Sequence, residues 1–326
     1  MTRHQLTAFI AVIALVAVSL LRALWNPVLS LIQASLFAIA ALGIRRGDGS
    51  SALGAALLVG VPGFTLMAKV LLRGPSGGGT LEFGIQAGVL AIWSGVLVTL
   101  LIWAALNMRL WSVPGAAGWG ALAIVLLAGA IVYTPFVIPT GSMKETLLIG
   151  DYILVREVGV PKPSRRDLVI VRFPADPKTL FAKRVIALGG DRVRLVNKKL
   201  LLNGVEQNEP YAIHKSSYVD AYRDNFPSEP NTHVYGDWAA ELLRAMKGNE
   251  LVIPPGKVFL LGDNRDESLD SRYWGYVDES EIVGQPALIY FSYDAPVRSL
   301  RAPAEIPWPP MFKPSTIRWE RIFKVL

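Results

Sequence analysis

The feature that most limits how this chain can fold is a succession of long apolar stretches without a charged side chain. These charge-free runs cover residues 5–21, 23–44, 49–68, 83–108 and 110–143. A helix needs about 20 apolar residues to cross the hydrocarbon core of a bilayer. We therefore expect a membrane domain over residues 1–135, with five spanning helices near residues 6–21, 27–44, 52–72, 84–106 and 116–135.

Basic residues between the expected helices indicate the orientation of this domain. Lysine and arginine are enriched in short cytoplasmic loops. With a cytoplasmic amino terminus, the inner connections carry Arg3, Arg45, Arg46 and Arg109. The outer ones carry Arg22 and Arg73, with Lys69 near a helix end. The bias favours a cytoplasmic amino terminus. Five crossings then place the residues after 136 on the extracytoplasmic side.

The charge distribution and the missing residue types exclude several classes of function. The chain has a net charge of +7 and no cysteine. Most of the excess positive charge lies between the apolar runs, so no dense basic stripe indicates nucleic-acid binding. Without cysteine there are no disulfides, thiolate metal sites or cysteine nucleophile. The three histidines lack metal-ligand spacing, and we expect neither a metal nor an organic cofactor.

From residue 136 the long apolar runs give way to short segments rich in Val, Ile, Leu and Phe between turn residues. The clearest segments are residues 152–156, 168–173, 181–188, 193–196, 251–253, 258–261 and 287–291. This pattern predicts a mainly antiparallel β domain over residues 136–326. Residues 207–250 are more polar, with one helix expected at 237–246, and we interpret them as an insertion. Residues 316–325 are expected to form a closing strand.

A small-residue loop carries the first candidate catalytic group. The sequence Pro-Thr-Gly-Ser-Met places Ser142 seven residues after Pro135. An extended chain spans about 3.3 Å per residue, so Ser142 lies within about 23 Å of the end of the last expected helix. A simple turn is the alternative interpretation of such a loop. A serine hydroxyl needs a neighbouring base to act as a nucleophile.

A lysine on an apolar strand is the candidate base. In the expected strand 181–188, alternation places Lys183 on the same face as Phe181, Val185 and Ala187. Burial lowers the pKa of a lysine because it disfavours the charged form. A neutral lysine amine can deprotonate a serine, as in the Ser-Lys variants of the catalytic triad. The alternative is an edge lysine whose amine reaches water.

A third stretch follows the apolar segment at 258–261 and mixes acids, amides, hydroxyls and two arginines, in the order Gly-Asp-Asn-Arg-Asp-Glu-Ser-Leu-Asp-Ser-Arg over residues 262–272. It is interpreted either as a solvated hairpin or as the group of hydrogen bonds and ion pairs that holds a catalytic lysine. We call residues 262–272 the acidic box.

Taken together, the Pro-Thr-Gly-Ser-Met sequence, the Phe-Ala-Lys-Arg sequence at 181–184 and the acidic box resemble the bacterial type I signal peptidase family. The resemblance covers roughly residues 134–326. It implies that Ser142 is the nucleophile and Lys183 the general base, with no cofactor. It also implies that the Ser142 N–H and the Thr140 hydroxyl form an oxyanion hole. Ser268 would then hydrogen-bond Lys183, and Asp270 and Arg272 would brace the acidic box.

The resemblance further implies shallow pockets for the small side chains that precede a signal-peptide cleavage site. Their expected lining is Ile138, Pro139, Met143, Leu147, Phe181 and Ala182. The implied partners are preprotein signal peptides, the lipid bilayer and the secretion translocon. One departure lies in the serine loop, where relatives commonly have proline two residues after the methionine and this chain has Glu145.

The sequence thus predicts a multi-pass helical membrane domain followed by a mainly antiparallel β extracytoplasmic catalytic domain. The predicted activity is removal of N-terminal signal peptides by a membrane-bound serine endopeptidase. Three alternatives stay open: a membrane scaffold or sensor with an inactive peptidase-like domain, a peptidase dedicated to pilin or conjugation substrates, and a self-cleaving Ser-Lys regulator. The apolar runs argue against the last, because such regulators are soluble.

Overall fold

A computed structural model of the chain describes residues 3–22, 36–42, 44–46, 48–58, 132–229, 233–294 and 314–326, and the single positions 101, 102, 105, 121 and 129. The chain divides into two units. The amino-terminal unit is Met1–Thr134 with Trp308–Ile317, and the β unit is Pro135–Pro307 with Arg318–Leu326. Each unit has hydrophobic clusters of its own.

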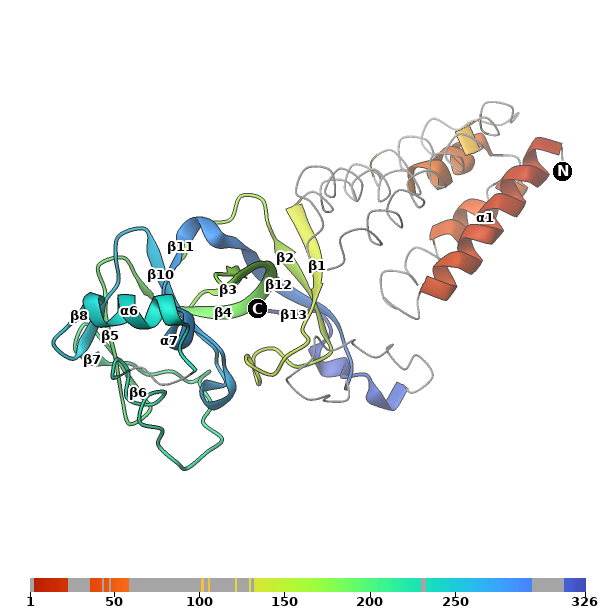
Figure 1. The fold of residues 1–326 in the computed structure, drawn as a ribbon. Helices are drawn as coiled ribbons and strands as arrows, with labels where there is room; N and C mark the ends of the chain where they lie inside the picture. Colours follow the sequence, from red (N-terminus) through yellow and green to blue (C-terminus); the bar gives the residue numbers. More distant parts are fainter. Residues whose placement is uncertain are drawn as a thin grey trace. The chain divides into compact units, whose positions relative to one another are not determined.

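The described part of the amino-terminal unit is mainly helical, apart from the first residues of the strand Tyr133–Val137. Helix α1 (Arg3–Arg22) is drawn in red in Figure 1, and shorter helical stretches lie at 36–42 and 49–58. Its cluster includes several alanines together with Val12, Phe37 and Ile44. None of the helices in the described residues is both long and apolar enough to cross a membrane. The expected helix 84–106 lies almost wholly outside the described residues, as do parts of 27–44 and 52–72. Most of the expected helix 116–135 also lies outside them, but its predicted end is wrong, because Tyr133–Val137 form a strand.

An eight-stranded sheet forms the first layer of the β unit (Figure 1). Its strands are β1 (Tyr133–Val137), β2 (Asp151–Arg156), β3 (Leu168–Phe173), β4 (Asp176–Leu188), β10 (Lys257–Leu261), β11 (Val277–Asp278), β12 (Ile282–Ser292) and β13 (Lys324–Val325). They follow the order β1-β2-β12-β3-β4-β10-β11, and β13 pairs with β12. The pairings of β3 with β4 and of β4 with β10 are antiparallel.

A five-stranded antiparallel sheet forms the second layer, in the order β7-β6-β5-β9-β8. Its strands are β5 (Arg192–Val196), β6 (Lys199–Leu202), β7 (Val205–Glu206), β8 (Met246–Lys247) and β9 (Glu250–Val252). The helical elements of the β unit are α6 (Gly236–Ala245), α7 (Ser271–Trp274) and the short helices η1 (Arg265–Glu267), η2 (Glu279–Glu281) and η4 (Trp319–Arg321).

Strand β10 joins the two layers because both of its faces are apolar. Val258 and Leu260 belong to a cluster with Val185 of β4. Phe259 and Leu261 belong instead to the cluster that includes Leu195 and Leu251 of the five-stranded sheet. A strand covered on both sides is an almost continuous apolar run, which explains the sequence Val-Phe-Leu-Leu. The acidic box begins directly after this buried strand.

The prediction of a mainly antiparallel β domain is confirmed, and the predicted helix at 237–246 matches α6 within one residue. The predicted closing strand at 316–325 is wrong for most of its length, because only Lys324–Val325 is a strand. Before it the chain turns through η4. This turn allows the Arg321 guanidinium to reach the buried Asp151 carboxylate, with Nη2 2.6 Å from Oδ2.

Candidate active site

The structure brings the two predicted catalytic side chains together. Ser142 lies in the turn between β1 and β2, and Lys183 lies in the middle of β4. Lys183 Nζ is 2.9 Å from Ser142 Oγ, although 41 positions separate them in the chain. A base must lie within about 2.6–3.2 Å of the hydroxyl that it deprotonates. The pair therefore has the geometry of a nucleophile and its base.

The surroundings of Lys183 favour its neutral form. Its side chain is 1% exposed, and Nζ lies 5.2 Å from the centre of the Phe181 ring and 5.9 Å from that of Trp274. Burial lowers the pKa of Lys183 from 10.5 to about 8, although the negative charge of Asp270 opposes this shift. A lysine with a pKa near 8 is partly neutral close to neutral pH, as a general base must be.

The acidic box holds the serine loop by direct hydrogen bonds. The backbone N–H of Asn264 donates to the Ser142 carbonyl at 3.0 Å. The side-chain amide of the same residue donates to the Gly141 carbonyl at 2.9 Å. Both carbonyls flank the nucleophile, so the position of the Ser142 hydroxyl depends on the position of Asn264.

A fully buried ion pair lies at the carboxyl-terminal end of the acidic box. The Asp270 and Arg272 side chains are both 0% exposed, and Arg272 Nη2 lies 2.8 Å from Asp270 Oδ2. Arg272 Nε adds a second bond of 2.8 Å to Oδ1. Asp270 Oδ2 also accepts from the Gly262 N–H at 3.1 Å. Burial alone would raise the pKa of Asp270, but the Arg272 charge outweighs it and holds that pKa below its ordinary value.

Ser268 lies at the site, but its expected bond to Lys183 does not form in the structure. Its Oγ is buried and has no hydrogen-bond partner among the described residues. The side chain packs directly on Gly262, where an added Cβ would lie 2.5 Å from Ser268 Cβ and 2.6 Å from the Ser142 carbonyl oxygen. The proposed role of Ser268 in aiming Lys183 stays a prediction.

The residues expected to line substrate pockets fall into two groups. Ile138, Met143 and Leu147 are at most 5% exposed and belong to a core cluster with Ile153 and Ile289. By contrast, Pro139 is exposed, and Phe181 and Ala182 are partly exposed. Thr140, the expected oxyanion donor, is also partly exposed, two residues before Ser142. Of the expected pocket residues, only Pro139, Phe181 and Ala182 can contact a substrate without a movement of the core.

Two contacts at this site were not predicted from the sequence. Arg184 points away from Lys183 and pairs with the buried Asp263, with Nη2 2.5 Å from Oδ2. Asp263 also accepts from the Thr146 hydroxyl, so it joins β4 to the serine loop. In addition, Trp274 stacks on Phe181 with 5.1 Å between ring centres. The alternation that buries Lys183 already placed Arg184 on the opposite face, but nothing in the sequence identified its partner.

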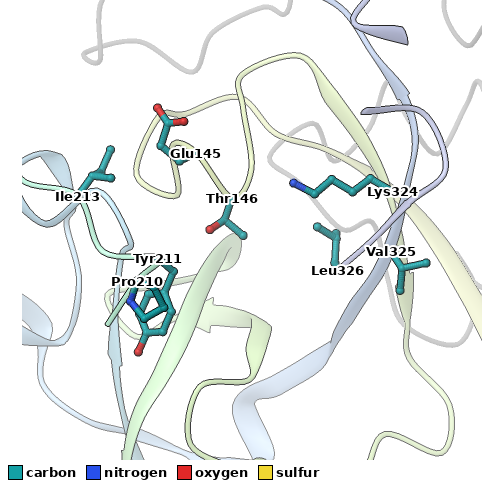
Figure 2. A pocket seen from close by; sticks show the side chains of 8 residues that line it. All are labelled: Glu145, Thr146, Pro210, Tyr211, Ile213, Lys324, Val325 and Leu326. Atoms are coloured by element: carbon teal, nitrogen blue, oxygen red, sulfur yellow. The ribbon is translucent and has the colours of Figure 1, made fainter. Parts of the chain in front are cut away.

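The serine loop differs from the family pattern at Glu145, which has a φ of 74°. A proline ring fixes φ near −65°, so the proline expected here from the family resemblance could not adopt this conformation. Glu145 borders a groove of about 550 Å³. Figure 2 shows its lining: Glu145, Thr146, Pro210, Tyr211, Ile213, Lys324, Val325 and Leu326. None of the predicted pocket residues lines this groove.

Comparison with known proteins adds an independent observation. Residues 115–291 match the family described as "Signal peptidase, peptidase S26". A signal peptidase I of Pseudomonas fluorescens is 32% identical over 221 residues, which cover 56% of this chain and 73% of that protein. A signal peptidase I of Aquifex aeolicus is 31% identical, with 53% of this chain and 81% of the relative covered. A signal peptidase IB of Staphylococcus aureus strain COL is 32% identical, with 53% of this chain and 85% of that protein covered.

Proposed function

The chain belongs to the signal peptidase family, peptidase S26, and we propose that it removes N-terminal signal peptides from secreted preproteins with Ser142 and Lys183. The observation that carries this proposal is the 2.9 Å contact between Lys183 Nζ and Ser142 Oγ. A buried lysine beside a serine hydroxyl has few structural uses, because a charged amine is costly to bury unless it is paired. As a base, by contrast, it benefits from that burial.

In the proposed reaction, Ser142 Oγ attacks the carbonyl carbon of the scissile peptide bond while neutral Lys183 accepts the hydroxyl proton. The resulting ammonium then donates a proton to the leaving amine as the carbon–nitrogen bond breaks. An acyl-enzyme on Ser142 remains, and Lys183 activates the water that hydrolyses it. The Ser142 N–H and the Thr140 hydroxyl are the proposed donors to the oxyanion, and one such donor is typically worth about 2.7–4 kcal/mol in the transition state.

We also propose that the amino-terminal region anchors the enzyme in the bacterial cytoplasmic membrane, with the β unit on the extracytoplasmic side. The support is the succession of charge-free apolar runs and the distribution of arginines between them. This arrangement would place Ser142 close to the membrane surface, where a signal peptide leaves the bilayer. Lipid and the secretion translocon are the proposed partners of this region.

The test is cleavage of a preprotein with small residues before the scissile bond, by the full chain in its membrane fraction. We expect Lys183→Ala to lower the rate by about 10²–10⁴-fold, the usual contribution of a positioned acid–base group. Ser142→Ala removes the nucleophile itself and should lower the rate further, by about 10⁶-fold. Lys178→Ala is the matched control, since Lys178 lies on the same strand but is exposed. Cleavage by Lys183→Ala at the wild-type rate would contradict the proposal.

A further inference from the structure

A second buried ion pair joins the acidic box to the polar segment that follows β7. Arg265 Nη1 lies 2.8 Å from Glu209 Oε2, and Nη2 lies 2.6 Å from Oε1. The side chains of Glu209 and Arg265 are 8% and 1% exposed. Such a bidentate contact fixes the orientation of the guanidinium as well as its distance from the carboxylate. Glu209 comes from the expected insertion at 207–250, and the sequence assigned neither residue a role.

Arg265 contacts both ends of the acidic box. Its Nε donates to the Gly262 carbonyl at 3.1 Å, and its own carbonyl accepts from Arg272 Nη2 at 2.8 Å. Gly262 in turn packs on Ser268 and on the Ser142 carbonyl. A shift of the Arg265 guanidinium would therefore act on the residues that surround the nucleophile.

The backbone of the segment that carries Glu209 also forms hydrogen bonds with the acidic box. The Ile213 N–H donates to the Asp263 carbonyl at 2.8 Å, and the Arg265 N–H donates to the Ile213 carbonyl at 3.0 Å. These bonds hold Ile213 beside Asn264 in a parallel bridge. Asn264 is the residue whose N–H and amide hold the two carbonyls of the serine loop. The segment that carries Glu209 thus supports the box along its backbone as well as through a side chain.

Removing the Glu209 charge would leave Arg265 buried without its counter-ion. Breaking a buried pair by deleting one partner is strongly unfavourable, since the remaining charge stays uncompensated. Arginine cannot relieve this by losing its proton. The guanidinium would have to move toward water, and its bond to the Gly262 carbonyl would then be lost.

We propose that Glu209 is a positioning residue for the peptidase reaction, which acts through Arg265 to hold the acidic box against Ser142 and Lys183. This inference rests on the proposed function. It gives the segment after β7 a part in catalysis without contact with the substrate. Because Glu209 acts on the dyad and not on the pocket, its loss should lower kcat and leave KM nearly unchanged.

The test measures kcat and KM of the full chain with a peptide that has small residues before the cleavage site. The rate is divided by the concentration of folded enzyme, measured by circular dichroism, so that loss of folded protein does not lower it. We expect Glu209→Gln to lower kcat at least tenfold and to change KM less than twofold. Glu206→Gln is the matched control and should stay within twofold of wild type, because Glu206 is exposed and pairs with exposed Lys199.

A double variant shows whether the two residues act as one unit. Groups that act together are not additive, so Glu209→Gln combined with Arg265→Met should lose no more kcat than Arg265→Met alone. The proposal would be overturned if the fold losses in kcat of the two single variants multiplied in the double variant. It would also be overturned if Glu209→Gln kept a kcat within twofold of wild type while Lys183→Ala was inactive. A wild-type chain that cleaves nothing would overturn the proposed function and this inference together.

Discussion

The two sheets of the β unit use their interiors differently. The eight-stranded sheet carries Lys183, and the acidic box that follows its strand β10 contributes the fully buried pair of Asp270 and Arg272. The five-stranded sheet turns Val193, Leu195 and Leu251 into an apolar cluster. Buried charges are costly unless they are paired and hydrogen-bonded. The first layer therefore buries a reactive lysine beside its own apolar clusters, at a cost in stability. The buried side chains on the strands of the second layer are all apolar and contribute to stability.

Gly262→Ala gives the largest effect expected from this comparison. An added Cβ would lie 2.6 Å from the Ser142 carbonyl oxygen, so either the serine loop or Ser268 must move. A misplacement of about 1 Å near a reacting group can lower a rate about 10²-fold. We expect a loss of that size in kcat per active site, measured by peptide cleavage.

The matched variant is Gly236→Ala at the start of α6, where an added Cβ meets nothing within 4 Å. It belongs to the helix that packs on the five-stranded sheet, and its kcat should equal that of wild type. A Gly262→Ala enzyme with wild-type kcat would show that the close contact with the serine loop has no catalytic meaning.

Leu251→Ala should reverse the pattern, with a large effect on stability and a small one on the reaction. Leu251 is 0% exposed and lies on β9, between β5 and β8 of the five-stranded sheet. Truncating a buried leucine to alanine costs about 2–5 kcal/mol. We expect a loss of that size in the unfolding free energy of the β unit, measured by denaturant unfolding, with kcat per active site within twofold of wild type.

Val205→Ala serves as its control, since Val205 of β7 is 63% exposed and should change stability by less than about 0.5 kcal/mol. A tenfold fall in kcat per active site for Leu251→Ala would break the proposed division between the two layers. It would mean that apolar packing in the second sheet, and not only the Glu209–Arg265 contact, sets the geometry of the dyad.

The sequence predicted the chemistry of the site better than its supports. Alternation along β4 placed Lys183 on an apolar face, and the structure buries it beside Phe181 and Trp274. That inference works because a strand has a fixed period of two. The partners of Arg184 and Arg265 were not predicted, since Asp263 and Glu209 lie 79 and 56 positions away in the chain. Local patterns carry no information on pairing over such distances.

For the fold, the sequence likewise predicted local elements but not the long-range contacts that interrupt them. Short apolar segments between turn residues predicted most strands of the β unit, but the buried Asp151 carboxylate draws Arg321 inward and interrupts the expected closing strand. The contact between Arg321 and Asp151 is an ion pair, and the periodicity of apolar residues cannot predict such a pair. A helix does cover the expected first span at 6–21, but no helix of the described residues qualifies as a membrane span. The other four expected membrane helices remain a prediction from charge-free runs.

The pH dependence of kcat/KM for peptide cleavage by the full chain tests the central claim most directly. The neutral amine of Lys183 is the reactive form, and burial lowers its pKa to about 8. The rate should therefore rise about tenfold per pH unit below that pKa and level off above it. A rate that is independent of pH between 6 and 10, or that rises only near the ordinary lysine pKa of 10.5, would contradict Lys183 as the buried base of Ser142.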